Sequence, residues 1–208
     1  MRTLRNTLLP LLAVGILITA GVGTATQASA ATSTPSPPSQ ATLDALEKAV
    51  FSSPDPASAF KHLTPTQQDI VRQAETPSGK GTSTVSVVGV GANRGKTFAA
   101  SPNTEGCWDW DGTWTTTALL GNWITKSFET LEVCYHVSVV QSVTLKNVRG
   151  DGAWGWALTS HTEGTKNWII RGEGVSWQTW TAGDDHSSIC PLMWGDAGSA
   201  NIQNNCTL

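Results

Sequence analysis

The sequence predicts a mainly β protein: a disulfide-stapled antiparallel β-sandwich or small barrel, preceded by a short helical segment. All ten tryptophans and all four cysteines fall within residues 107–208. This region alternates apolar and polar residues in runs typical of strands, and Asp-Gly and Gly-x-Gly pairs separate the runs. Turn signals at a spacing of roughly 10 to 20 residues indicate about six to eight strands.

Residues 1–30 have the three-part layout of a secretory signal peptide. The basic residues Arg2 and Arg5 precede an apolar run over residues 8–18, and Ala28-Ser29-Ala30 gives the small-residue cleavage signal. The apolar run is shorter than the roughly 20 residues that a membrane-spanning helix needs. We therefore expect a secreted, extracellular protein with no membrane partner after signal cleavage.

The charge of the mature chain argues against nucleic-acid binding. Cleavage after Ala30 removes Arg2 and Arg5, which leaves 11 basic side chains against 16 acidic ones, a net charge of −5. A mildly acidic protein lacks the positive surface that binds phosphate backbones or anionic lipids. We expect no nucleic-acid partner.

A linker and a helical segment follow the signal. Residues 31–40 contain three prolines and no charge, which predicts a disordered linker. Residues 41–76 carry Leu43, Leu46 and Val50 at helical spacing. They contain too few large apolar residues for a core of their own, so they either dock on the β domain or form a small mobile hairpin.

Capping residues divide this segment into two or three short helices. Asp55 and Thr64 are each followed by proline, which suits the first helical position. Thr64 and Gln67 also have the spacing of a capping box. Pro77 ends the helical pattern.

Residues 77–106 read as a connector rich in Gly, Ser and Thr, with one possible strand over 84–90. The run Gly89–Thr97 has glycines and a Gly-Lys-Thr triplet, yet its spacing fits neither the phosphate loop nor the dinucleotide fingerprint. A flexible basic loop is the better interpretation.

Four cysteines in a secreted chain predict two disulfides. We favour the sequential pairs Cys107–Cys134 and Cys190–Cys206, each of which would stabilise the fold by about 3 kcal/mol. The other two connectivities remain open. Because no pair has the two-residue spacing of a zinc knuckle, we expect no metal and no cofactor.

Several strands and turns can be assigned within residues 107–208. Residues 128–140 read as one strand, with Leu131, Val133 and Tyr135 on one face. Turns are expected at Asp-Gly and Gly-x-Gly positions, namely 111–112, 150–152 and 172–174.

The tryptophans suggest a binding surface. Trp108 and Trp110 share one strand face, while Asp109 and Asp111 lie on the other. Aromatic rings stack on sugar rings and carboxylates bind hydroxyls, so we expect a non-catalytic protein that binds an extracellular glycan or cell-wall polymer. The expected ligand-binding residues are Trp108, Asp109, Trp110, Asp111, Trp114, Trp154 and Trp156.

The competing interpretation places these rings in the core. Phe128 is the only phenylalanine and Tyr135 the only tyrosine after residue 106, so tryptophan must supply bulk there.

Two other function classes stay open. A small secreted hydrolase of glycosidase type would use neighbouring carboxylates, and the candidate pairs are Asp109/Asp111, Glu129/Glu132 and Asp184/Asp185. This spacing is non-specific, so no catalytic residue is assigned. An inhibitor, toxin or bacteriocin would use a rigid loop, for which the region 184–206 is the candidate. The oligomeric state is left open.

A resemblance supports the layout. The helical run Leu43–Val50, the helix start Leu63-Thr64-Pro65, and the motifs Gly106-Cys107-Trp108 and Val133-Cys134-Tyr135 resemble secreted actinobacterial proteins of unassigned function. Those proteins pair a short helical leader with a Trp- and Cys-rich β domain. The resemblance implies compartment and layout, and it implies no catalytic residue.

Overall fold

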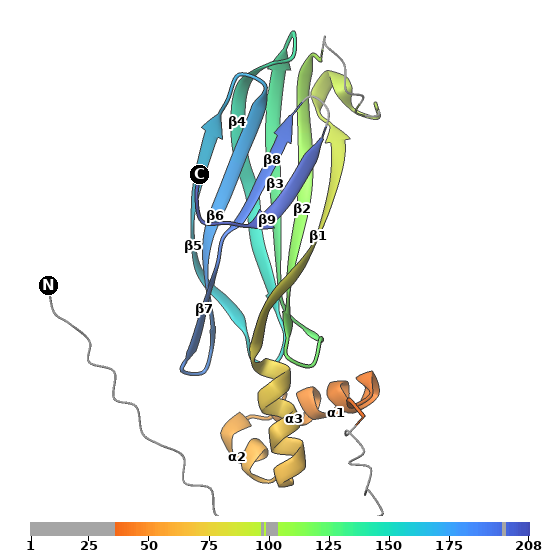
Figure 1. The fold of residues 1–208 in the computed structure, drawn as a ribbon, viewed down its shortest axis with the longest axis vertical. Coiled ribbons are helices and arrows are strands. Elements are labelled where there is room, and N and C mark those ends of the chain that lie inside the picture. The colour runs from red at the N-terminus through yellow and green to blue at the C-terminus, as the bar shows by residue number, and fades with distance from the viewer. Residues whose placement is uncertain (1–35, 97, 99–103, 197–198) are drawn as a thin grey trace, which may run out of the picture. The chain divides into compact units, whose positions relative to one another are not determined.

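Two antiparallel sheets face each other and are not closed into a barrel (Figure 1). The computed structural model describes residues 36–96, 98, 104–196 and 199–208. The expected signal peptide, residues 1–30, and the first half of the linker lie outside the described residues. The mainly β fold class is confirmed, and the sandwich is the form it takes.

The first sheet has the strand order β1-β2-β3-β4. Its strands are β1 Pro77–Gly89, β2 Gly106–Ala118, β3 Trp123–His136 and β4 Val139–Gly152. The expected connector 77–106 therefore supplies a full edge strand, because β1 pairs with β2 from Pro77↔Ala118 to Gly89↔Trp108. A short 3-10 helix, Gly91–Asn93, follows β1.

The second sheet has the order β5-β6-β8-β9, and β7 pairs with β6 beside β8. Its strands are β5 Ala157–Asn167, β6 Arg171–Ala182, β7 Asp185–Ile189, β8 Pro191–Asp196 and β9 Ala200–Asn204. β6 is the central strand, because its first half pairs with β8 and its second half with β7.

Three helices precede the sheets, as the capping residues predict. They are α1 Gln40–Phe51, α2 Pro56–Lys61 and α3 Pro65–Glu75. The side chain of Asp55 caps α2 by accepting from Ser58 N at 3.0 Å. The capping box between Thr64 and Gln67 is present at the start of α3.

The helices dock on one end of the sandwich. Asn122 in the β2–β3 turn donates to the Ala74 carbonyl at 2.9 Å, and the indole N–H of Trp156 donates to the Glu75 carbonyl at 2.8 Å. Leu46 and Val71 belong to the same buried cluster as Trp156. The helical segment thus obtains from the sandwich the core that it cannot form alone.

Both expected disulfides are present. Cys107 and Cys134 are direct cross-strand partners on β2 and β3. Cys190 precedes β8 and is bonded to Cys206 after β9, which ties the C-terminal segment to the second sheet. The sequential pairing is confirmed.

Three turns lie where the sequence indicated no turn. The predicted strand 128–140 is interrupted at Val137 and Ser138, which both have positive φ (49° and 59°) and form the two-residue turn between β3 and β4. The apolar run Trp168-Ile169-Ile170 is the turn between β5 and β6. Trp154 and Gly155 form the left-handed turn between β4 and β5.

Conversely, the expected turns at 111–112, 150–152 and 172–174 all lie inside strands. Four of their glycines, at positions 112, 150, 172 and 174, face the opposite sheet at close range. A Cβ built on Gly174 would lie 2.5 Å from Leu131 Cδ1, and one on Gly112 would lie 2.4 Å from Met193 Cε. Glycine stands at these positions because the two sheets approach too closely for a side chain.

Polar residues divide the sandwich interior. Trp180 and Ile124 belong to the cluster next to the helices, whereas Leu131 and Met193 belong to the cluster at the other end. Between these clusters lie four buried polar side chains: Ser127 and Glu129 of β3, and Ser176 and Gln178 of β6.

Candidate functional site

The structure buries most of the tryptophans that were expected to bind ligand. Trp108 and Trp110 are 6% and 3% exposed and pack edge-on against Phe98, with ring centroids 4.9 and 4.7 Å away. Trp154 and Trp156 are buried beside the helices, and Trp114 is half-buried between the two interior clusters. None of these five rings offers a free face to a sugar, because they supply the bulk of a core that is poor in phenylalanine.

Asp109 and Asp111 do lie on the opposite, outer face of β2. The ammonium group of Lys146 lies 3.0 Å from Asp109 and 3.1 Å from Glu132. The hydroxyl of Thr130 donates to Asp111 at 2.7 Å. These carboxylates are engaged by neighbouring strands, and the described structure does not bring them together with the predicted tryptophans.

A hollow of about 520 Å³ opens on this outer face between β2, β3 and β4. Its aromatic wall is Phe128, but the guanidinium group of Arg149 covers that ring at 4.5 Å from the centroid. The hollow therefore lacks a free stacking platform.

A groove of about 750 Å³ lies where the helices meet the sandwich, and we call it the helix groove. Its lining is largely aliphatic and aromatic and includes four charged side chains. The lining residues are Val50, Phe51, Pro56, Ala57, Phe60, Lys61, Val71, Arg72, Glu75, Thr76, Gly155, Ala182, Gly183 and Asp185. A concave, largely apolar site with a few polar groups is the usual form of a small-molecule site.

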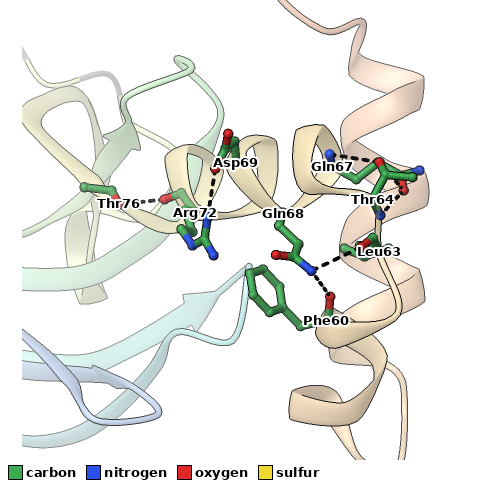
Figure 2. Close-up of polar contacts among 8 residues, drawn as sticks. All are labelled: Phe60, Leu63, Thr64, Gln67, Gln68, Asp69, Arg72 and Thr76. Atoms are coloured by element: carbon green, nitrogen blue, oxygen red, sulfur yellow. Dashed lines mark hydrogen bonds and ion pairs between the residues drawn. The ribbon is translucent and has the colours of Figure 1, made fainter.

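Local hydrogen bonds fix the helical wall of this groove, as Figure 2 shows. The backbone N–H and hydroxyl of Thr64 both donate to Gln67 Oε1 at 3.0 Å, which holds the start of α3. Gln68 Nε2 then donates to the carbonyls of Phe60 and Leu63 at 3.3 and 3.1 Å. The end of α2 is thereby tied to α3, which holds the Phe60 ring at the groove.

Arg72 extends the same wall. Its guanidinium group pairs with Asp69 at 2.8 Å and lies 5.3 Å from the centroid of the Phe60 ring. Both members of the ion pair are exposed, so the pair itself contributes little stability. Its role is to place a cation beside an aromatic ring at the rim of the groove.

Two carboxylates meet at this groove, one from each part of the fold. Glu75 is the last residue of α3 and is half-buried, while Asp185 begins β7 and is exposed. Burial raises the pKa of Glu75, the negative charge of Asp185 raises it further, and Arg72 opposes both effects. Such a pair attracts a cation, because a positive group placed between the carboxylates removes their mutual repulsion.

A second, more polar hollow of about 430 Å³ lies on the other side of Phe51. The backbone N–H of Trp154 donates to Glu47 of α1 at 3.0 Å, and Phe51 packs edge-on against the Trp154 ring. Gly155 is required here, because a Cβ would lie 2.7 Å from the Phe51 ring. Trp154 and Trp156 thus border this second hollow, and not the helix groove, and their rings are buried.

Glu129 is the most strongly perturbed acid, and it lies in the sandwich interior away from the helix groove. Burial raises its pKa to about 8, and the charge of Glu163 adds to this, while Ser176 and Gln178 oppose it as hydrogen-bond donors. Glu129 Oε2 has no hydrogen-bond partner among the described residues. Because Glu129 is 2% exposed, we assign it to the core rather than to the binding site.

The sequence contained no signal for the meeting of Glu75 and Asp185. It did name Asp185 within the candidate carboxylate pair Asp184/Asp185. In the part of the chain that the structure describes, no group of three or more His, Cys, Asp or Glu side chains has metal-binding geometry.

Comparison with protein-family models, with curated proteins and with solved structures yields no match for this chain. Among the described residues, no helix is long and apolar enough to cross a membrane.

Proposed function

We propose that the protein is secreted and acts as a non-catalytic binding protein, whose ligand occupies the helix groove. The ligand would carry an apolar face and a cationic head group. The observation that carries this proposal is the convergence of Glu75 and Asp185 in a groove whose lining is largely apolar and also includes Lys61 and Arg72.

The groove offers complementary surfaces to such a ligand. Phe51, Phe60 and Val71 would contact its apolar face, while the two carboxylates would bind the head group as charge-assisted acceptors. The volume lies within the range of about 300–1,000 Å³ that is usual for ligand pockets.

Among glycans, only amino sugars have the chemistry of the proposed ligand. The two most exposed tryptophans, Trp123 and Trp168, lie at opposite ends of the sandwich, so they cannot form one stacking strip. An oligomer of amino sugars nevertheless has the required chemistry, because its rings present C–H faces and its amines carry charge. An alkyl or aryl amine is the other source of the same chemistry.

Isothermal titration calorimetry on the chain without residues 1–30 would test this proposal. Glucosamine oligomers would be compared with N-acetylated oligomers of the same length, and decylamine with decanol. We expect binding by the amines and none by the neutral partners. Glu75→Gln or Asp185→Asn should weaken amine binding about tenfold, which is typical for loss of one charged hydrogen bond.

Asp184→Asn is the matched control, because Asp184 is an exposed neighbour that does not line the groove. It should bind amines like the unmodified chain. Equal affinity for acetylated and free oligomers would contradict a role for the carboxylate pair. Binding by the sugar amine but not by decylamine would identify the glycan as the source.

A second candidate, a hydrolase, is favoured by one specific observation. Glu75 holds its proton to a higher pH than an ordinary glutamate and lies near Asp185, which is the pairing of acid and base that glycosidases use. Release of reducing ends from a glucosamine oligomer, lost in both Glu75→Gln and Asp185→Asn, would establish this function. Binding of the oligomer without release of reducing ends would establish the non-catalytic binding function.

A further inference from the structure

Two turns at the end of the sandwich away from the helices carry exposed apolar side chains (Figure 1). The β5–β6 turn contributes Trp168, Ile169 and Ile170, and the β3–β4 turn contributes Val137 and Val139. Ile169 is 77% exposed, Ile170 62% and Trp168 47%. We call these five residues the apolar tip.

Hydrogen bonds hold the two turns together. The backbone N–H of Val140 donates to the Ile169 carbonyl at 2.9 Å, and Asn167 Nδ2 donates to the Val140 carbonyl at 3.3 Å. Within the β5–β6 turn, Trp168 N donates to the Arg171 carbonyl at 2.8 Å. The apolar side chains are therefore displayed on a defined backbone, away from the helix groove.

Cations flank the apolar residues of the β5–β6 turn, in the order Lys-Asn-Trp-Ile-Ile-Arg from Lys166 to Arg171. Lys166 lies over the Trp168 ring at 4.2 Å, and Arg171 lies over the Trp194 ring at 4.2 Å. Neither turn contains a carboxylate between residues 137–141 or 166–171.

Two nearby acids already have partners. Glu105 pairs with His136 at 3.1 Å and accepts from Val137 N at 2.8 Å, and Glu173 pairs with Arg171 at 3.4 Å. Glu173 therefore offsets the charge of Arg171, which also lies opposite Asp196 in the pairing of β6 with β8. Lys166 forms no ion pair among the described residues and gives the β5–β6 turn a positive charge that is complementary to the phosphates of a lipid surface.

The exposed area of the apolar tip favours a bilayer over a protein partner. Five partly exposed side chains present on the order of 500 Å² of apolar surface, which is near the largest patch on an ordinary monomer. A stable protein interface needs about 800 Å² from each partner and a complementary shape. A bilayer interface requires no complementary shape, and tryptophan with flanking lysine or arginine is the side-chain set that anchors proteins there.

We propose that the apolar tip docks on a phospholipid bilayer, with Ile169 and Ile170 entering the acyl boundary and Lys166 meeting the phosphates. The tip lies at the end opposite to the helix groove, so the groove would face away from the lipid. This interaction departs from the expectation of no membrane partner, which rested on the short apolar run and on net charge. A local apolar surface can dock on a bilayer without spanning it and can dominate over a small overall charge.

Vesicle flotation with the chain lacking residues 1–30 tests this proposal. Vesicles would consist of phosphatidylcholine alone or of an equimolar mixture with phosphatidylglycerol. We expect flotation with both and more with the mixture. The double variant Ile169→Ser/Ile170→Ser should lower the partition coefficient by about tenfold or more, because both transferred aliphatic groups are lost.

Leu119→Ser is the matched control, since Leu119 is 59% exposed in the β2–β3 turn near the helices. It should float like the unmodified chain. Trp168→Phe provides an independent readout: the variant should still float but should lose quenching of its fluorescence by brominated lipid. All variants replace exposed side chains, and circular dichroism would confirm that each is folded.

Three results would overturn the proposal. The unmodified chain would float with neither vesicle, or the double isoleucine variant would float as well as the unmodified chain. Alternatively, gel filtration would show self-association that the double variant abolishes, which would make the tip an interface between copies.

Discussion

Gln178 of β6 reaches across the sandwich to Glu129 of β3, with its Nε2 atom 3.3 Å from Glu129 Oε1. The same amide nitrogen donates to the Ser176 hydroxyl at 2.7 Å, and the hydroxyl in turn donates to Glu129. The indole of Trp180 donates to Gln178 Oε1 at 3.0 Å. A titratable acid is thus built into the interface between the two sheets.

Burial of Glu129 predicts that stability decreases as the pH rises. The folded-state pKa of Glu129 is about 8, above its unfolded value near 4.5, so the folded protein holds the extra proton between these values. The free energy of unfolding should therefore fall between about pH 4.5 and pH 8, by an amount on the order of a few kcal/mol. Urea unfolding at several pH values with the disulfides intact would measure it.

Glu129→Gln is the variant that isolates this effect. Glutamine keeps the acceptor that Ser176 and Gln178 use, and it cannot ionise. The variant should match the unmodified chain near pH 5, exceed its stability at pH 8, and lose most of the decrease between them. An unchanged pH profile in the variant would assign the effect to another group.

Amine binding in the helix groove should depend on pH in the opposite direction. Glu75 binds a cation only when ionised, and its raised pKa means that protonation begins at a higher pH than for an ordinary glutamate. Affinity for decylamine should therefore fall as the pH is lowered from neutral, and calorimetry across this range would measure it. Glu75→Gln should bind more weakly and show a flatter pH profile.

Close approach of the sheets predicts that Gly174→Ala is destabilising. The added Cβ would lie 2.5 Å from Leu131 Cδ1, so the facing strands must move or Leu131 must change its side-chain conformation. Overpacking of this kind costs about 1–3 kcal/mol. Thermal unfolding would detect the loss, and Ser86→Ala, on an exposed position of β1, should leave the midpoint unchanged.

Each disulfide should contribute about 3 kcal/mol to the free energy of unfolding. The bond Cys107–Cys134 spans 27 residues and Cys190–Cys206 spans 16, so loss of the first should cost slightly more. Double serine variants of each pair, compared by urea unfolding, would measure both contributions. Equal stability with and without either bond would contradict this expectation.

Short sequence patterns predicted the helix starts and the faces of strand β2 correctly, because both depend on neighbouring residues. Asp55 and Thr64 marked helix starts correctly, because a cap bonds to backbone groups within three residues. Alternation placed Trp108 and Trp110 on one face and Asp109 and Asp111 on the other. The same alternation carries a signal for Glu129, since it lies two residues from Leu131 on the inner face.

The turns that were expected at glycines were wrong because glycine has two uses in this chain. Glycine in this chain marks contact between sheets as well as turns, and the two uses look alike in sequence. Gly172 and Gly174 read as a turn, yet they lie in β6 where Val133 and Leu131 approach. The true turn at Val137-Ser138 contains no glycine. The pairing of Glu75 with Asp185 depends on how the helices dock, which no local pattern encodes.

The docking of α1–α3 determines the smallest piece of this chain that can fold. A fragment beginning at Cys107 would lose β1 and leave the edge of β2 unpaired. A fragment beginning at Pro77 would keep the sheets but uncover Ile124, Trp154 and Trp156, which are now buried beside the helices. Both fragments would expose surface that favours aggregation. The autonomous folding unit therefore starts at the cap of α1, Ser39. The helices belong to the β domain because they bury apolar residues of the sandwich.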